Sequence, residues 1–162
     1  MKTTLITGGL GFIGSNICDS LLQKKYTNKC ILLDNFGGYM NPIKDSFIDF
    51  RKQRFPSLKN IIIERCDTSN YKALSSILNK YKPNYIYHTA ALPLAKVSNL
   101  NNEEAKISSV DSTVNIIDAI NLLKNSKQKY QFDRFIYFSS SMVYGDFKKP
   151  TVTEESEKNP KD

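Results

Sequence analysis

The chain has 162 residues, of which 40% are hydrophobic and 24% are charged, so we expect one globular domain with its own core and not a disordered chain. It contains neither the roughly 20 consecutive apolar residues of a membrane helix nor the apolar N-terminal region of a signal peptide, which predicts a cytoplasmic protein without a membrane partner. The net charge of +7 comes from scattered lysines without a nucleic-acid recognition motif. We interpret it as a solvated surface that also attracts anionic ligands, and we expect no nucleic-acid partner.

The first element combines an apolar strand over Thr3–Thr7 with glycines at Gly8, Gly11 and Gly14 and a helical pattern over Phe12–Lys24. This is the layout of a strand, a tight phosphate-binding turn and a helix N-terminus. Gly8 lets the chain leave the strand sharply, Gly11 lets the backbone approach a pyrophosphate, and Gly14 lets the helix pack closely. The N–H groups at the start of the helix favour phosphate binding.

A second apolar run, Cys30–Asp34, ends in an acid 20 residues after Gly14. A carboxylate at this position accepts hydrogen bonds from the adenine ribose of NAD, and it would repel the additional phosphate of NADP. The alternative is a glycine-rich loop followed by an aspartate by chance. The order of strand, glycines, helix, strand and acid favours the dinucleotide site.

Strand-like and helical patterns alternate along the rest of the chain. We predict strands at Asn60–Glu64, Tyr85–His88 and Arg134–Ser139, and helices at Lys44–Arg54, Tyr71–Tyr81 and Glu103–Lys124. Pro83 ends the helix before the fourth strand, and the tail from Lys148 onward is a loop. The pattern predicts an α/β fold, a Rossmann-type doubly wound parallel sheet with strand order 3-2-1-4-5, whose ligand crevice lies beyond the carboxyl ends of the strands.

The three cysteines, Cys18, Cys30 and Cys66, are too far apart for the common zinc patterns. We expect Cys18 and Cys30 to be small core residues in a reducing compartment, and we expect no metal site.

Five segments together resemble a known family. They are 7–14, reading TGGLGFIG; Asp34-Asn35-Phe36; Cys66-Asp67-Thr68; His88-Thr89-Ala90-Ala91; and 138–145, reading FSSSMVYG. The chain resembles the N-terminal half of the extended short-chain dehydrogenases/reductases, and more closely the NAD-dependent nucleotide-sugar epimerases and dehydratases. The first and last segments are specific to the family, whereas each of the middle three is weak evidence on its own.

The resemblance implies NAD as the cofactor and assigns it binding positions at several strand ends. Phe12 and Ile13 would lie along the pyrophosphate, and Asp34 would hold the adenine ribose with Asn35 nearby. The remaining positions are Asp67 and Thr68 at the adenine, and Thr89, Ala90 and Ala91 along the path to the nicotinamide ribose.

For catalysis, the resemblance implies that Ser140, four residues before Tyr144, orients the sugar hydroxyl that is oxidised. Ser141 is the alternative if the loop is shifted by one residue. A serine-rich strand end that only satisfies backbone groups is the structural interpretation. His88, the single histidine, is interpreted as structural because it ends a buried strand.

The sequence departs from the family pattern in two places. Ser109 stands where an asparagine commonly helps to hold the active site. The family's Tyr-x-x-x-Lys pair on a helix is expected at or just past the end of this chain, and Tyr144 with Lys148 is not a substitute because a proline-containing loop follows. We therefore expect residues 1–162 to be the N-terminal part of the NAD(P)-binding domain of a longer protein, without its catalytic helix and substrate domain.

The activity implied for the parent protein is that of an isomerase or lyase of carbohydrate metabolism. It would act on a nucleotide-diphosphate sugar through a transient keto-sugar, whereas this chain alone would be inactive. A reductase of the same family that consumes NAD(P)H and a non-catalytic dinucleotide-binding module remain as alternatives. Family members commonly form homodimers, and exposed apolar surface in the fragment predicts self-association.

Overall fold

The computed structural model describes residues 2–37, 53, 55, 58–92, 102–126 and 130–160. Its centre is a parallel five-stranded sheet in the order β3-β2-β1-β4-β5, which confirms the predicted strand order. The strands are β1 Thr3–Thr7, β2 Lys29–Asp34, β3 Ile61–Arg65, β4 Tyr85–His88 and β5 Arg134–Tyr137.

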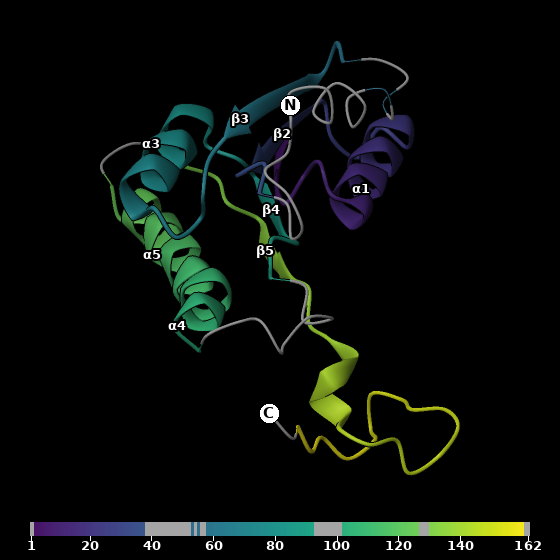
Figure 1. Cartoon of the computed structure of the whole chain (residues 1–162). Coiled ribbons are helices and arrows are strands. Elements are labelled where there is room, and N and C mark those ends of the chain that lie inside the picture. Colours follow the sequence, from purple (N-terminus) through teal and green to yellow (C-terminus); the bar gives the residue numbers. More distant parts are fainter. Residues whose placement is uncertain are drawn as a thin grey trace.

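Helices cover both faces of the sheet (Figure 1). Helix α1 (Phe12–Gln23) lies on one face, and α3 (Tyr71–Tyr81) and α5 (Ser112–Lys124) pack against each other on the other face. The segment after β5 runs away from the sheet through the 3-10 turn η3 (Ser141–Tyr144). The tail from Lys148 to Pro160 has no helix or strand, which confirms the predicted loop. The helix expected over Lys44–Arg54 lies, apart from Gln53, outside the described residues.

The core forms two clusters because successive strand residues point to opposite faces of a sheet. Leu5 of β1 belongs to the cluster beneath α3 and α5, and its neighbour Ile6 belongs to the cluster beneath α1. Cys18 and Cys30 lie buried in the second cluster, as expected, and Cys66 lies in the first. Burial raises the pKa of the Cys66 thiol to about 11, so this thiol is unreactive at neutral pH.

Helix α3 has the bounds that its sequence predicts because both ends carry strong signals. The Asn70 side chain accepts a hydrogen bond from the N–H of Ala73 at 3.1 Å, which caps the first turn. At the other end Lys82 adopts a left-handed conformation with φ 44°, and Pro83 follows. A left-handed residue and a proline are common where a helix stops.

The single helix expected over Glu103–Lys124 is interrupted. The structure has a short helix α4 (Asn102–Ala105), a π-helical stretch η2 (Lys106–Asp111) and then α5. The hydroxyls of Ser112 and Thr113 donate to carbonyls four residues earlier, Ser108 and Ser109, at 2.7 Å each. Such bonds compete with the helical ladder and bend helices, and π-helical turns are frequent at functional sites.

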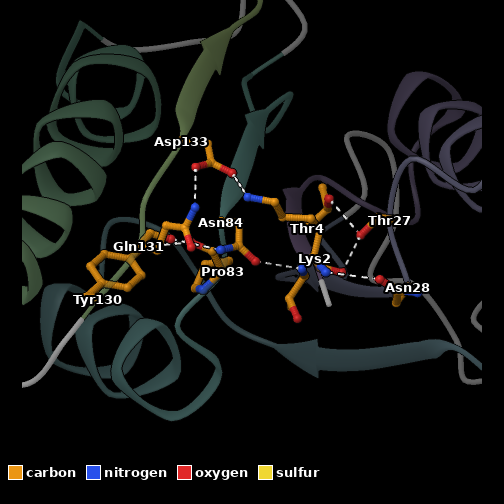
Figure 2. Close-up of polar contacts among 10 residues, drawn as sticks. Lys2, Thr4, Thr27, Asn28, Pro83, Asn84, Tyr130, Gln131 and Asp133 are labelled. Atoms are coloured by element: carbon orange, nitrogen blue, oxygen red, sulfur yellow. Dashed lines mark hydrogen bonds and ion pairs between the residues drawn. The ribbon is translucent and has the colours of Figure 1, made fainter.

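The amino ends of β1, β4 and β5 are joined by a polar cluster, the N-terminal edge network of Lys2, Asn84, Gln131 and Asp133 (Figure 2). The Asn84 side chain accepts from the N–H of Thr3 at 2.9 Å and donates to the carbonyl of Gln131 at 2.8 Å. Lys2 forms an ion pair with Asp133. This network lies at the edge of the sheet opposite to the predicted ligand crevice.

Among the described residues, no helix has the length and apolar character needed to cross a bilayer. The same part of the chain holds no group of three or more side chains suited to bind a metal ion.

Candidate functional site

The glycine loop after β1 is closely packed against its surroundings. Gly8 has φ +64°, a left-handed conformation that favours glycine. A Cβ atom on Gly14 would lie 2.4 Å from the carbonyl oxygen of Gly8, so the start of α1 touches the loop backbone and leaves no room for a side chain. The conformation of this loop and its close packing against α1 therefore depend on glycine at both positions.

The start of α1 faces solvent. Phe12 and Ile13 are 77% and 52% exposed, and no acidic side chain lies in the first helical turn. The first N–H groups of a helix have no partner within it, and they carry partial positive charge. Together with the loop, they form a site suited to a phosphate or pyrophosphate.

Asp34, at the carboxyl end of β2, is only 8% exposed, and its carboxylate faces the glycine loop. Its two oxygens accept hydrogen bonds from the N–H of Leu10 at 3.1 Å and of Phe36 at 2.9 Å. A carboxylate accepts about four hydrogen bonds. The remaining capacity of Asp34 is suited to ribose hydroxyls beside the phosphate site.

The end of β3 supplies Asp67 and Thr68. The Asn35 amide donates to Asp67 at 3.1 Å, so the ends of β2 and β3 are joined. Burial raises the pKa of the Asp67 carboxyl, but hydrogen bonds from Ser69 and Asn35 offset this, and the pKa lies below its ordinary value. Asp67 is therefore an anionic acceptor at neutral pH. Thr68 is buried, and Asn115 of α5 donates to its carbonyl at 3.1 Å.

On the other side of the loop, Thr7 holds the backbone that follows β4. The Thr89 hydroxyl donates to the Thr7 carbonyl at 2.6 Å, and the N–H of Ala90 donates to the Thr7 hydroxyl at 3.2 Å. A Cβ atom on Gly8 would lie 3.0 Å from the nitrogen of Ala90. Thr89 and Ala90 therefore lie directly beside the glycine loop, and Ala91 follows them with an exposed side chain.

His88 is buried between the sheet and α5, with 2% of its surface exposed. Burial lowers the pKa of its imidazole to about 4, so the ring is neutral at physiological pH. Its nitrogens contact the hydroxyls of Thr7 and Thr113 at 2.7 and 3.1 Å. This burial supports the structural interpretation of His88.

The serines expected at the reaction centre follow β5. The N–H of Phe138 donates to the carbonyl of His88 at 3.3 Å, so the chain leaves β5 beside the end of β4. Ser140 is exposed, and its hydroxyl accepts a hydrogen bond from the N–H of Met142 at 3.2 Å, while Ser141 begins η3. The Ser140 hydroxyl keeps a hydrogen to donate.

Tyr144 ends η3 and Lys148 lies in the tail, where it pairs with Glu157. The two side chains therefore do not share a helix, as the sequence indicates. Ser109 lies in the π-helical stretch, and its carbonyl accepts the hydroxyl of Thr113.

The described contacts join the glycine loop to Asp34 on one side and to Ala90 on the other, and they join Asn35 to Asp67. Ser140 and Ser141 hydrogen-bond within their own turn, and Ser109 is linked to the β4 end through Thr113 and His88. Sequence reasoning assigned no role to Thr7, Gly9 or Thr113. Thr7 and Gly9, where a Cβ atom would lie 2.7 Å from that of Leu32, belong to the quoted segment 7–14, whereas Thr113 carried no signal.

The strand order divides the site into two halves. The ends of β2 and β3 lie on one side of the β1 loop and those of β4 and β5 on the other. A dinucleotide with its pyrophosphate on the loop would place one nucleoside on each side, and an acid at the end of β2 marks the adenosine half. The residues present thus fit a nicotinamide dinucleotide.

The curated relatives of this chain include a 4-epimerase and a 4,6-dehydratase. The chain is 30% identical over 155 residues to a UDP-glucose 4-epimerase of Caenorhabditis elegans, covering 94% of this chain and 42% of the relative. It is 30% identical over 145 residues to a dTDP-D-glucose 4,6-dehydratase of Dictyostelium discoideum, covering 90% of this chain and 30% of the relative. The chain therefore spans less than half the length of these relatives.

Solved structures share the fold. A UDP-glucose-4-epimerase from Stenotrophomonas maltophila, with bound NAD and formylated UDP-arabinopyranose, matches with a TM-score of 0.76 at 18% identity over 98% of this chain and 43% of its own. The UDP-Glc/GlcNAc 4-epimerase of Campylobacter jejuni matches with a TM-score of 0.74 at 23% identity, covering 99% of this chain and 44% of that epimerase chain.

A family model covers almost the whole chain. The model described as GDP-mannose 4,6 dehydratase matches residues 5–162, from the third residue of strand β1 through the glycine loop and all the predicted site residues. With the strand order and the relatives above, this match shows that the chain belongs to the GDP-mannose 4,6 dehydratase family.

Proposed function

We propose that this chain is the NAD-binding part of an enzyme that epimerises or dehydrates a nucleotide-diphosphate sugar through a transient keto-sugar. The observation that carries the proposal is the glycine loop, with Asp34 hydrogen-bonded to its Leu10 N–H at 3.1 Å. Family membership supports the reaction class, because relatives of this chain are named as 4-epimerases and as a 4,6-dehydratase.

In this proposal the first turn of α1 binds the pyrophosphate. Asp34 accepts from the adenine ribose, with Asn35 and Asp67 next to it, joined at 3.1 Å. Asp67 and Thr68 contact the adenine. When bound, NAD would accept a hydride from the sugar and return it. The negative charge of Asp34 favours NAD over NADP, because two anionic groups at close range repel each other.

Thr89, Ala90 and Ala91 would border the nicotinamide half, with Ser109 behind them. The exposed Ser140 hydroxyl would orient the sugar hydroxyl that is oxidised, because a hydroxyl can donate and accept at once. Ser141 takes this role if the loop shifts by one residue. The resemblance places the proton acceptor on a Tyr-x-x-x-Lys helix, which these 162 residues do not include, so we propose no activity for this chain alone.

Two other functions are separable by experiment. A reductase of the same family would exchange its cofactor freely, whereas an epimerase or dehydratase retains it during purification. A non-catalytic binding module would lack a Tyr-x-x-x-Lys motif in the coding sequence that follows Asp162. The presence of that motif supports an enzyme.

The test is the binding of NAD and NADP to the chain, measured by calorimetry. We expect NAD to bind more tightly than NADP, and Asp34→Asn to weaken NAD binding by about tenfold, the effect of one lost charged hydrogen-bond partner. Asp118→Asn removes one charge from the exposed surface of α5 and serves as the control. Failure of the wild-type chain to bind NAD, or an equal effect of both variants, would contradict the proposal.

The sugar specificity is tested on the protein that contains this chain together with any residues that follow it. Incubation with UDP-, dTDP- and GDP-linked sugars should give an epimer or a keto-sugar with at least one of them. We also propose a cytoplasmic location, supported by three cysteines that form no disulfide.

A further inference from the structure

A continuous hydrogen-bonded chain crosses the core from the end of β4 to the π-helical stretch. This His88 network consists of Ala90, Thr7, His88, Thr113 and Ser109. The successive distances are 3.2 Å from the Ala90 nitrogen to the Thr7 hydroxyl, 2.7 Å to His88 Nδ1, 3.1 Å from Nε2 to the Thr113 hydroxyl and 2.7 Å to the Ser109 carbonyl.

Each group in the network donates its hydrogen bond to the next, in the order from Ala90 to Ser109. The Thr113 hydroxyl donates to the Ser109 carbonyl, which is an acceptor only, so Thr113 accepts the hydrogen of His88 Nε2. Nδ1 of a neutral ring is then an acceptor and takes the Thr7 hydroxyl hydrogen. This leaves the Thr7 oxygen free to accept the N–H of Ala90.

The surroundings of the His88 ring keep it neutral, with its proton on Nε2. It packs beside Phe135 and Tyr137 of β5, with ring centroids 6.1 and 5.8 Å away. A protonated ring would donate from both nitrogens and would oppose the donation from Thr7. Burial keeps the imidazole pKa near 4, and the neutral form persists at physiological pH.

Both ends of the network lie on one side of the glycine loop. Ala90 follows β4, which pairs with β1 on the side away from β2 and Asp34. Ser109 lies in η2 and is linked to the same strand, β4, through Thr113 and His88. Because Asp34 marks the adenosine half, the network fixes the backbone that faces the other nucleoside.

We propose that His88 is a positioning residue for the nicotinamide half of the site: through the Thr7 hydroxyl it fixes the backbone of Ala90, and through Thr113 it ties this backbone to Ser109. The inference rests on the proposed binding of NAD. It assigns His88 no contact with the cofactor and no proton transfer.

The test compares two ligands on the same chain by calorimetry, since ADP occupies only the adenosine half and the phosphate loop, whereas NAD occupies both halves. We expect His88→Leu, which removes both ring nitrogens, to weaken NAD binding by about tenfold and ADP binding by less than about twofold. His88→Asn keeps an acceptor for the Thr7 hydroxyl and should recover most of the lost NAD affinity.

Thr4→Val is the matched control, because it removes another buried hydroxyl from β1 at the end remote from the site, where Thr4 contacts Thr27 at 3.0 Å. It should change neither affinity. If His88→Leu does not fold, Thr113→Val removes the shorter of the two hydroxyl contacts from α5 to Nε2, 3.1 Å against 3.5 Å for Ser112, and should give the same split between ligands.

Equal losses for NAD and ADP, or no loss for either, would overturn the role of His88 while leaving NAD binding by the wild type intact. A wild-type chain that binds ADP but not NAD, or neither, would overturn both this inference and the proposed function.

Discussion

At the scale of single residues, burial acts differently on the two polar groups on either side of the glycine loop. Asp67 is stabilised as an anion by donors from Ser69 and Asn35, whereas His88 is surrounded by hydroxyls and aromatic rings and loses its charged form. The adenosine side thus offers negative charge, and the opposite side offers a neutral, fixed backbone.

The depressed pKa of His88 predicts acid sensitivity. The folded state binds this proton only near pH 4, and the unfolded chain binds it near pH 6.5. Between these values the unfolded state holds more protons, so stability is complete above about pH 6.5 and falls as the pH is lowered, by up to about 3 kcal/mol. Urea unfolding at several pH values measures this loss.

Because His88 is the single histidine, the difference between wild type and His88→Asn isolates its contribution from that of the carboxyl groups. The variant should lose less stability between pH 6.5 and 4. Parallel pH profiles for the two proteins would show that His88 does not titrate differently on folding.

A site residue can be predicted from sequence when the backbone pattern fixes its position, and not when side-chain packing does. Gly14 and Asp34 can be predicted because the backbone pattern alone brings strand ends together at one edge of a parallel sheet. Thr7 and Thr113 could not be, because their roles require the His88 ring, 81 and 25 residues away in the chain. Such contacts are determined by side-chain packing and produce no periodic pattern in the sequence.

At the scale of elements, the signals for strands were stronger than the signal for one helix. Strands β1 and β4 have the predicted bounds, whereas β5 stops at Tyr137, two residues before its predicted end. The stretch Lys106–Asp111 keeps a helical composition, but hydroxyls of the following residues bond to its carbonyls, a competition with the helical ladder that an apolar period does not reveal.

The N-terminal edge network predicts a local source of stability. Asn84→Ala removes the bonds to Thr3 and Gln131 that join the starts of three strands and should lower the free energy of unfolding by about 2 kcal/mol, at about 1 kcal/mol for each bond. Asn28→Ala, which removes one exposed bond to Lys2, is the control and should cost well under half as much.

Denaturation in urea measures both changes. Since this network lies at the amino ends of the strands, whereas the glycine loop follows the carboxyl end of β1, Asn84→Ala should leave NAD affinity unchanged once the chain is folded. A stability loss no larger than that of the control would contradict the role of Asn84 as a link between strands.

At the scale of the whole molecule, two surface properties oppose each other. The net charge of +7 favours separate chains through mutual repulsion. However, apolar side chains are exposed along η2 and α5, and four of them form an apolar stripe: Ile107, Val110, Val114 and Ile117. Their spacing of three, four and three residues places them on one side of the helical segment. Exposed apolar surface of this kind marks interaction sites.

We therefore expect the chain to self-associate through the apolar stripe, and to do so more strongly as salt is added. Salt screens the repulsion between positively charged chains but does not weaken apolar contacts, because the Debye length falls from about 10 Å at 0.1 M to about 3 Å at 1 M. Sedimentation velocity at several salt concentrations measures the association.

Val114→Glu, in the middle of the stripe, should give monomers, whereas Tyr26→Glu, an exposed residue just after α1 on the opposite face of the sheet, should not. A monomeric wild type at high salt, or an equal effect of both variants, would show that the stripe does not drive association. An association that weakens with salt would instead identify ion pairs as its source.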